Sequence, residues 1–403
     1  MKKILFILLL TVPFIGFGQS FEKTFGGTDE DLGYSVQQTT DGGYIITGST
    51  YSFGNGDWDV YLIKTDSSGN ELWYKTFGGT GREKGYSVQQ TTDGGYIITG
   101  STNPTIFGTE DIYLIKTDGS GNELWNKTFG GTSEEIGYSV QQTTDGGYIV
   151  TGVTYYVGNG YDIYLIKIDD SGNELWNKTF GGTQDDESYS VQQTTDGGYI
   201  VCGRTKSFGN GYSEIYLIKT DVNGDSLWTK VLGGVISERG YSVQQTNDGG
   251  YIIVGYSNSY GNGLLHDCYL LKVDGNGDQQ WDQVFTQSHE SSGNSVQQTT
   301  DGGYIICGMK RSNTNGVPNV FLIKTDGNGI EQWNKTFGGN DGDEGRSVQQ
   351  TNDGGYIIVG WTESFSNGYD VYLIKTDDSG NITSTFSISN PSSNRKLDKV
   401  INL

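Results

Sequence analysis

The feature that most constrains this chain is a tetrapeptide, SVQQ, that recurs seven times. It begins at Ser35, Ser87, Ser139, Ser190, Ser242, Ser295 and Ser347, at intervals of 51 to 53 residues. A repeat of about 50 residues with strand-like content is typical of small sheets that stack on one another and share one core. We therefore expect an all-β chain, a seven-bladed β-propeller of four-stranded antiparallel blades, although 403 residues would otherwise suggest two or three domains.

Each repeat divides into four short strands that are separated by turn residues. In the first copy we expect strands at Tyr34–Thr40, Tyr44–Thr50, Asp59–Thr65 and Glu71–Phe77. The second and third strands, YIITG and VYLIK, are continuous apolar runs, which indicates that both of their faces are covered. Blades packed face to face around an axis meet that requirement.

The two ends of the repeat region predict how the ring closes. Six repeats carry a Trp in the fourth strand, which we interpret as packing between blades: Trp73, Trp125, Trp176, Trp228, Trp281 and Trp333. The last repeat has only a degenerate fourth strand, Asn381–Phe386, without a Trp. The segment Phe21–Gly27 contains the KTFGG of a fourth strand, with Phe21 at the Trp position. We expect it to complete the last blade.

Three segments follow from the pattern along the chain. Residues 1–18 are predicted to be a signal peptide, because two lysines precede an apolar run with Pro13 that is too short to span a bilayer. Residues 19–387 form the propeller, with repeats starting near 34, 86, 138, 189, 241, 294 and 346, and residues 388–403 form a tail. The expected location is therefore secreted or at the cell surface.

Charge and cysteine content limit the partners. A net charge of −22 should repel nucleic acid and anionic membranes, and we expect no membrane insertion and a monomer. Cys202, Cys268 and Cys307 each replace a Thr, Val or Ile of other repeats, so they are predicted to be free and buried.

The repeat, through SVQQTTDGGYIITG and YLIKTDSSGNELW, resembles the secreted seven-bladed β-propellers of bacteria that use the type IX secretion system. The tail NPSSNRKLDKVINL looks like the opening of the C-terminal sorting segment of that system. This resemblance implies the same fold and export to the cell surface, and it implies no particular activity.

Parts that are identical in all repeats are most simply scaffold. The Gln pair of each SVQQ is interpreted as a hydrogen-bonding layer around the channel, with a channel ligand as the alternative. An acid that precedes the third strand, as in Asp59 and Glu214, is interpreted as a loop staple, with metal ligation as the alternative. The turns DGNGD and DVNGD are interpreted as hairpins rather than calcium loops, so calcium is possible but not required, and no cofactor is expected.

The variable loops are the candidate binding surface. They comprise the loops between blades and those between the second and third strands, which emerge on one face of a propeller. The candidate ligand-binding residues are Trp58, Tyr155, Tyr156, Tyr161, Phe208, Tyr212, Tyr260, Trp361, Asp29, Asp31, Glu134, Asp185 and Asp186. Aromatic rings beside polar groups suit sugar stacking or protein contact, but these rings also suit packing of their own loops.

No catalytic residue is assigned. The chain has two His residues, no nucleophile motif, and Arg82, Arg239 and Arg346 in loops of different blades. The sequence thus favours a non-catalytic binding or scaffold propeller whose ligand is a carbohydrate or a protein. The alternative is an extracellular enzyme of polysaccharide breakdown, a glycosidase or lyase, that uses carboxylates on the same face.

Overall fold

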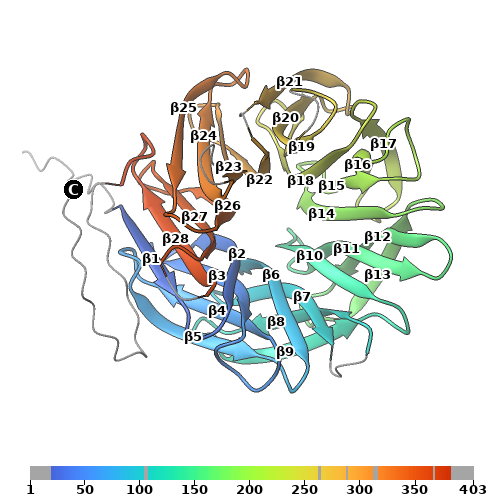
Figure 1. Cartoon of the computed structure of the whole chain (residues 1–403). Helices are drawn as coiled ribbons and strands as arrows, with labels where there is room; N and C mark the ends of the chain where they lie inside the picture. Colours follow the sequence, from blue (N-terminus) through green and yellow to red (C-terminus); the bar gives the residue numbers. More distant parts are fainter. Residues whose placement is uncertain are drawn as a thin grey trace, which may run out of the picture.

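The computed structural model describes residues 20–103, 108–261, 265–286, 289–311, 316–365 and 368–382. These residues form seven four-stranded antiparallel sheets that are arranged as blades around a central axis (Figure 1). The predicted all-β, seven-bladed propeller is confirmed. The proposed signal peptide, the tail and most of the degenerate segment Asn381–Phe386 lie outside the described residues.

The first three blades follow the repeat in chain order. Blade 1 consists of β2 (Asp31–Gln38), β3 (Tyr44–Thr50), β4 (Asp59–Thr65) and β5 (Glu71–Phe77). Blade 2 consists of β6 (Arg82–Gln90), β7 (Tyr96–Asn103), β8 (Asp111–Thr117) and β9 (Glu123–Phe129). Blade 3 consists of β10 (Glu135–Gln142), β11 (Tyr148–Tyr156), β12 (Gly160–Ile168) and β13 (Glu174–Phe180).

The remaining blades continue the same order until the last one. Blade 4 consists of β14 (Asp186–Gln193), β15 (Tyr199–Thr205), β16 (Glu214–Thr220) and β17 (Ser226–Leu232). Blade 5 consists of β18 (Glu238–Gln245), β19 (Tyr251–Ser257), β20 (Asp267–Val273) and β21 (Gln279–Phe285). Blade 6 consists of β22 (Ser291–Gln298), β23 (Tyr304–Arg311), β24 (Pro318–Thr325) and β25 (Glu331–Phe337). Blade 7 combines β26 (Asp343–Gln350), β27 (Tyr356–Thr362) and β28 (Asp370–Thr376) with β1 (Phe21–Phe25).

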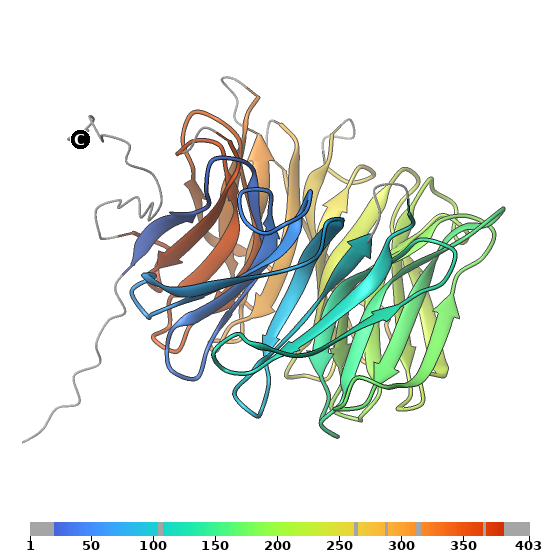
Figure 2. The same cartoon turned by 90° about the horizontal axis from the view of Figure 1, so that it is seen from below.

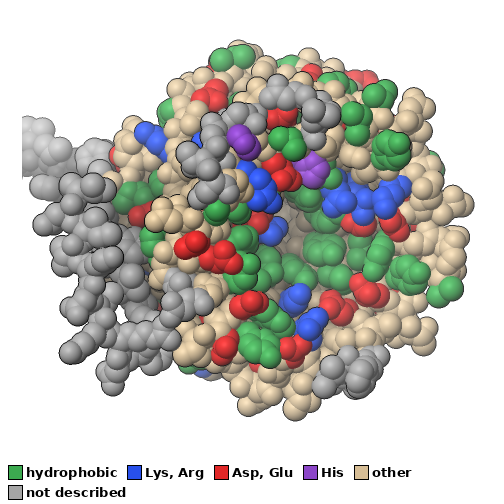
Figure 3. Space-filling view, in the orientation of Figure 1, with side chains coloured by type: hydrophobic (Ala, Val, Ile, Leu, Met, Phe, Trp, Pro, Cys, Tyr) green, Lys and Arg blue, Asp and Glu red, His purple; other side chains and the backbone are tan. Residues whose placement is uncertain are grey.

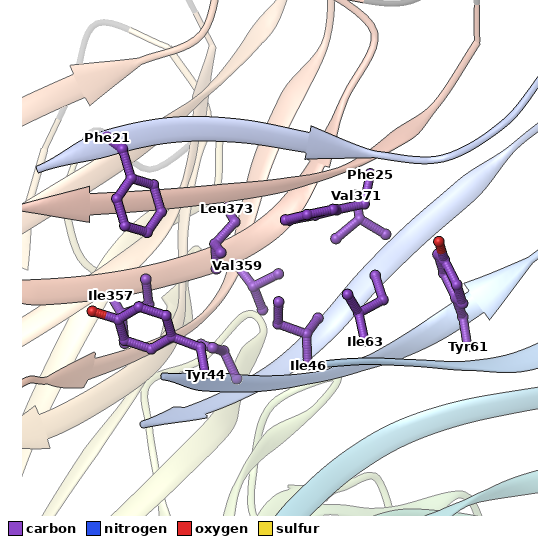
Figure 4. Packing of buried hydrophobic residues seen from close by; sticks show 11 residues of the cluster. Phe21, Phe25, Tyr44, Ile46, Tyr61, Ile63, Ile357, Val359, Val371 and Leu373 are labelled. Carbon is purple, nitrogen blue, oxygen red and sulfur yellow. The ribbon is translucent and has the colours of Figure 1, made fainter. Parts of the chain in front are cut away.

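Strand β1 closes the ring as predicted. It pairs antiparallel with β28, from Phe21 opposite Lys375 to Phe25 opposite Val371. Figure 4 shows both Phe rings of β1 directed into the core that blade 7 shares with blade 1. The first and last blades therefore share one apolar core.

Aromatic side chains fill the outer part of each seam between blades. Trp73 of blade 1 packs against Tyr96 of blade 2 with ring centroids 6.1 Å apart, and five further Trp–Tyr pairs repeat this contact. At the closing seam Phe21 packs against Tyr44, also at 6.1 Å. The predicted packing role of the Trp residues is confirmed, and Phe21 takes that role for blade 7.

A buried lysine in the third strand of every blade was not anticipated from the sequence. Its ammonium group pairs, at 2.8 to 3.0 Å, with the Asp of the TDGG or NDGG turn that joins the first two strands. It also donates to the carbonyl of the residue that follows it. These lysine side chains are only 1 to 5% exposed, so each blade contains one internal ion pair at its turn-rich face.

The two faces of the ring differ, as the view of Figure 2 illustrates. Short hairpin turns occupy one face, whereas the loops between blades and between the second and third strands meet on the other. Backbone hydrogen bonds join the loops between blades to the loops between the second and third strands. Examples are Tyr51 N–H to Glu30 C=O at 2.8 Å and Glu83 N–H to Trp58 C=O at 2.7 Å. The second face is called the loop-rich face below.

Candidate functional site

The innermost strand of each blade begins earlier than predicted and contains a β-bulge. In blade 1 it begins at Asp31 rather than Tyr34, and its register with β3 shifts between Gly33 and Ser35. The same shift occurs in the other six blades. A bulge leaves one residue unpaired and redirects its side chain. The seven bulge residues are Tyr34, Tyr86, Tyr138, Tyr189, Tyr241, Asn294 and Arg346.

The bulge residues form a ring around the axis. Successive Tyr rings from Tyr34 to Tyr241 lie 5.2 to 5.5 Å apart. The Arg346 guanidinium lies 5.9 Å from the Tyr34 ring, which links the last blade to the first. Five aromatic rings are thus followed by an amide and a guanidinium, so the sevenfold symmetry breaks in blades 6 and 7.

Below this ring the axis is lined by the SVQQ motif. The side-chain carbonyl of the first Gln in each blade accepts a hydrogen bond from the backbone N–H of the second Gln in the next blade, at 2.5 to 2.6 Å. The second Gln accepts from a turn N–H of the preceding blade at 2.8 to 2.9 Å. The predicted hydrogen-bonding layer is confirmed. It surrounds a channel of about 260 Å³ that is lined by Val and Gln.

Above the bulge ring, one cross-strand pair per blade differs from blade to blade. The pairs are Leu32–Ser49, Lys84–Ser101, Ile136–Val153, Glu187–Arg204, Arg239–Tyr256, Ser292–Met309 and Glu344–Trp361. In blades 1 to 3 these pairs consist of small or apolar side chains, apart from Lys84. The charged and large side chains of this layer are concentrated in the pairs of blades 4 to 7.

A pocket of about 330 Å³ lies among blades 5, 6 and 7 beside the axis. Its lining includes three bulge residues, two of which are not Tyr, and members of the variable cross-strand pairs. The lining residues are Arg239, Tyr241, Tyr256, His266, Ser292, Asn294, Met309, Glu344 and Arg346. Figure 3 shows the hollow at the axis of the loop-rich face, with basic and His side chains gathered along part of its edge. We call this cavity the axial pocket.

The axial pocket corrects one prediction. The sequence predicts Arg239 and Arg346 in loops of different blades, but both lie on inner strands, β18 and β26. The structure brings both arginines to one cavity together with His266 and Glu344. Arg82 belongs elsewhere, because it pairs with Asp57 of an outer loop at 2.7 Å.

Polar contacts fix most groups in the axial pocket. Glu344 accepts from Asn294 Nδ2 at 2.8 Å and from Arg346 Nη2 at 3.1 Å, so both of its carboxylate oxygens are engaged. The Arg239 guanidinium lies 5.9 Å from the Tyr256 ring, and its Nε is buried without a hydrogen-bond partner. Burial raises the pKa of Tyr241, while the nearby positive charge of Arg239 opposes that shift.

His266 forms one wall of the axial pocket. Its ring stacks on Tyr256 with centroids 4.1 Å apart and planes 9° from parallel. Its Nδ1 lies 3.2 Å from Glu290 Oε1. Burial lowers the pKa of His266, the Glu290 carboxylate raises it, and Arg239 lowers it further. The net shift is downward from 6.5, which favours the neutral ring near pH 7.

The predicted aromatic residues lie around the whole loop-rich face rather than in one cluster. Tyr155 contacts Tyr161, and Trp361 contacts Tyr369. Three further candidates each pack against an aromatic neighbour in their own blade, in the pairs Trp58–Tyr51, Phe208–Tyr216 and Tyr260–Tyr269. Tyr156 is exposed, and Tyr212 is 79% exposed. These contacts agree with loop packing and leave a role in binding as a prediction.

The predicted acids fall into two groups. Asp31 and Asp186 are fully buried and accept hydrogen bonds from Gly27 and Gly182 N–H at 2.8 Å, which suits a structural role. The other three are closer to the surface: Asp29 beside Thr28, Asp185 paired with Lys206 at 2.7 Å, and Glu134 accepting from the Tyr161 hydroxyl at 2.9 Å.

The two metal-related motifs behave as structural turns. Asp59 Oδ2 accepts from Asn55 and Gly56 N–H, and Glu214 Oε1 accepts from Asn210 and Gly211 N–H, which confirms the loop staple at these positions. Asp274 Oδ1 accepts from the N–H groups of its own hairpin. Within the described part of the chain, no three His, Cys, Asp or Glu side chains are grouped to hold a metal ion.

Comparison with known proteins supports the fold. No protein family matches the chain. A curated relative, the regulatory protein FlaEY of Caulobacter vibrioides, is 24% identical over an alignment of 222 positions that covers 46% of this chain and 23% of that protein. The match therefore spans less than a quarter of the relative's length.

Solved structures share the propeller at low identity. They include Chaetomium thermophilum Sqt1 bound to the N-terminus of the ribosomal protein L10, with a TM-score of 0.50 and 12% identity over 88% of this chain and 98% of that one. They also include the α-L-arabinanase of Penicillium chrysogenum complexed with arabinobiose, with a TM-score of 0.50 and 12% identity over 89% and 98%. Propellers of this shape thus include a protein-binding protein and an enzyme. Among the described residues of our chain, no helix is long and apolar enough to cross a membrane.

Proposed function

We propose that this chain is a secreted or cell-surface binding protein, without catalytic activity, that holds a carbohydrate in the axial pocket of its loop-rich face. The observation that carries the proposal is the axial pocket itself, where sevenfold symmetry gives way to a polar cavity with aromatic walls. Tyr241 and the His266 ring stacked on Tyr256 offer ring surface, while Ser292, Asn294 and the arginines offer hydrogen bonds. A volume of about 330 Å³ suits one or two sugar residues.

The contacts of Glu344 favour binding over catalysis. Glycoside hydrolysis generally requires two carboxyl groups, one of which donates or removes a proton. Glu344 is the one carboxylate among the residues that line the axial pocket, and Asn294 and Arg346 occupy both of its oxygens. Such a group positions its neighbours and is poorly suited to exchange protons.

Glycan-array binding of the protein without its first 18 residues tests this function. Met309→Trp should fill the axial pocket and lower binding at least tenfold, and the fold should tolerate it because Trp361 occupies the same repeat position in blade 7. Leu227→Ala, at an exposed position of the outermost strand β17, is the control and should bind as the unchanged protein does.

Other outcomes identify the competing functions. Release of reducing ends from a bound glycan would establish the polysaccharide-degrading alternative. Loss of binding in Trp58→Ala and Tyr161→Ala, with normal binding by Met309→Trp, would place the ligand on the outer loops. Absence of any glycan binding, with capture of a protein partner that needs the exposed loops, would replace carbohydrate by protein.

A further inference from the structure

Arg239 differs from the other arginines of the described residues in its ion pairing. Four other arginines in the described ranges have ion-pair partners: Arg82 with Asp57, Arg204 with Glu187, Arg311 with Glu290, and Arg346 with Glu344. Arg239 has none among the described residues.

The surroundings of Arg239 make this imbalance costly. The guanidinium is half-buried among Tyr189, Tyr241 and Tyr256, and its Nε is a buried donor without a partner. A buried charge or unmade hydrogen bond lowers stability unless something compensates for it. Glu187, whose pKa Arg239 helps to lower, is already paired with Arg204, so Arg239 retains the capacity to pair with an anion from outside.

A second guanidinium faces the same cavity. Arg346 is held by Glu344, but its Nε is likewise buried without a partner. His266 is already engaged by Glu290. The lining of the axial pocket therefore holds two guanidinium groups against one carboxylate, an excess of one positive charge.

The form of the axial pocket limits the kind of anion. The planar fork of a guanidinium matches a carboxylate with two parallel hydrogen bonds. The ring of bulge residues lies at the inner end of the pocket, so a group enters from the loop-rich face. Acidic side chains also surround the hollow, as Figure 3 shows, and they would repel a chain with many negative charges.

We infer that the axial pocket binds a terminal sugar residue that bears a single carboxylate, with Arg239 as the partner of that carboxylate and Arg346 beside it. The inference rests on the proposed function and adds the chemical class of its ligand. We expect the remainder of the glycan to be uncharged, because acidic side chains surround the hollow.

Matched sugars test the inference directly. Methyl glucuronoside and methyl glucoside, and the corresponding galacturonoside and galactoside, differ only in the carboxylate. By calorimetry or ligand-observed NMR, the unchanged protein should bind one of the uronides at least tenfold more tightly than its neutral partner. The preference should shrink as NaCl is raised from low to high concentration.

Arginine variants test whether Arg239 causes the preference for the uronide. Arg239→Gln should remove the preference for the uronide, and Arg239→Lys should restore part of it. Arg82→Gln, which alters an exposed arginine at the start of β6 that pairs with Asp57, should leave it intact. Circular dichroism and urea unfolding of each variant confirm that the fold is retained.

The remaining outcomes separate this inference from the proposed function. Equal binding of acidic and neutral sugars would overturn the inference and leave the carbohydrate function standing. Binding of glucose 6-sulfate as tight as that of the uronide would overturn the choice of a carboxylate. Failure of every sugar, with Arg239-dependent binding of an acidic peptide, would overturn both.

Discussion

At the scale of single residues, the buried lysines are the most regular polar feature of the fold. Lys219 is 4% exposed, pairs with Asp196 at 2.9 Å and donates to the Thr220 carbonyl at 2.8 Å. A lysine is tolerated at such a site because its ammonium group reaches the turn while its aliphatic stem packs in the blade. The pair ties the first hairpin of each blade to the third strand.

Removing one such lysine should be measurably destabilising. In Lys219→Met the stem is kept, but the Thr220 carbonyl loses its donor and Asp196 its partner. We expect a loss of about 1–3 kcal/mol in the free energy of unfolding, measured by urea denaturation. Lys230→Met is the control, because Lys230 pairs with Asp278 at the surface, where an ion pair contributes little. Equal effects of the two substitutions would contradict the structural role of the buried pair.

The reactivity of the three thiols also follows from the surroundings of single residues. Cys202, Cys268 and Cys307 are free and buried, as predicted. Burial raises the pKa of each thiol far above its ordinary value. Because the thiolate is the reactive form, we expect almost no labelling by a thiol reagent in buffer and three labels per chain in denaturant. Fast labelling of the folded protein would contradict this placement.

At the scale of strands and blades, the closing strand has the clearest energetic role. Phe21 occupies the place of a Trp and contacts the Tyr44 ring. Phe21→Ala removes this contact and should lower stability by about 3–5 kcal/mol, as for other buried Phe truncations. Phe21→Trp should be neutral or stabilising, since six other seams accept Trp. Thermal unfolding compares the two variants, and an unchanged transition in Phe21→Ala would show that ring closure does not depend on β1.

The strands were predictable because each is repeated seven times with the same spacing. Second, third and fourth strands of blade 1 match their predicted bounds, since apolar runs and Gly turns mark them directly. The inner strand was predicted three residues too short at its start, because a bulge at Tyr34 interrupts the alternation that sequence patterns detect.

The axial pocket escaped prediction for a geometric reason. Arg239 and Arg346 lie 107 positions apart in the sequence and belong to blades 5 and 7. Loops at the rim of two such blades are far apart, but strand residues next to the axis are close together. The signal was present in the strands. Tyr is replaced by Asn294 and Arg346 at one repeat position, and Arg239 stands at a variable position where the other blades have Leu, Lys, Ile, Glu or Ser.

At the scale of the whole molecule, the two faces respond to pH in opposite directions. On the turn face, burial alone would raise the pKa of Asp93, Asp248 and Asp301, but hydrogen bonds from Lys, Thr and backbone N–H groups outweigh it and lower the pKa to about 2. A carboxyl group with a lowered pKa stabilises the fold above its unfolded pKa of about 3.9, and that stabilisation is lost as the pH falls through about 2.

The loop-rich face shows the opposite sign. Burial raises the pKa of Asp31, Glu83 and Asp343 despite hydrogen bonds to each. Their contribution is fully present below the unfolded pKa and is lost as the pH rises through the raised value. Urea midpoints should therefore be higher near pH 4 than at pH 7.5, because the raised-pKa carboxyls contribute fully only below their unfolded pKa of about 4, and midpoints should fall as the pH drops toward 2. A midpoint that rises steadily from pH 4 to pH 8 would contradict this profile.

The closing strand also has a consequence for how chains meet during refolding. Strand β1 supplies blade 7 with the KTF sequence that four of the six internal fourth strands contain. Its partner β28 can pair equally well with β1 of its own chain or with β1 of another molecule. At high concentration, rings that exchange this strand should form dimers and longer chains, by the donor-strand pairing that extends exposed sheet edges. The same interchangeability means that a synthetic peptide of residues 20–27 should restore the ring, in trans, to a protein from which that segment has been removed.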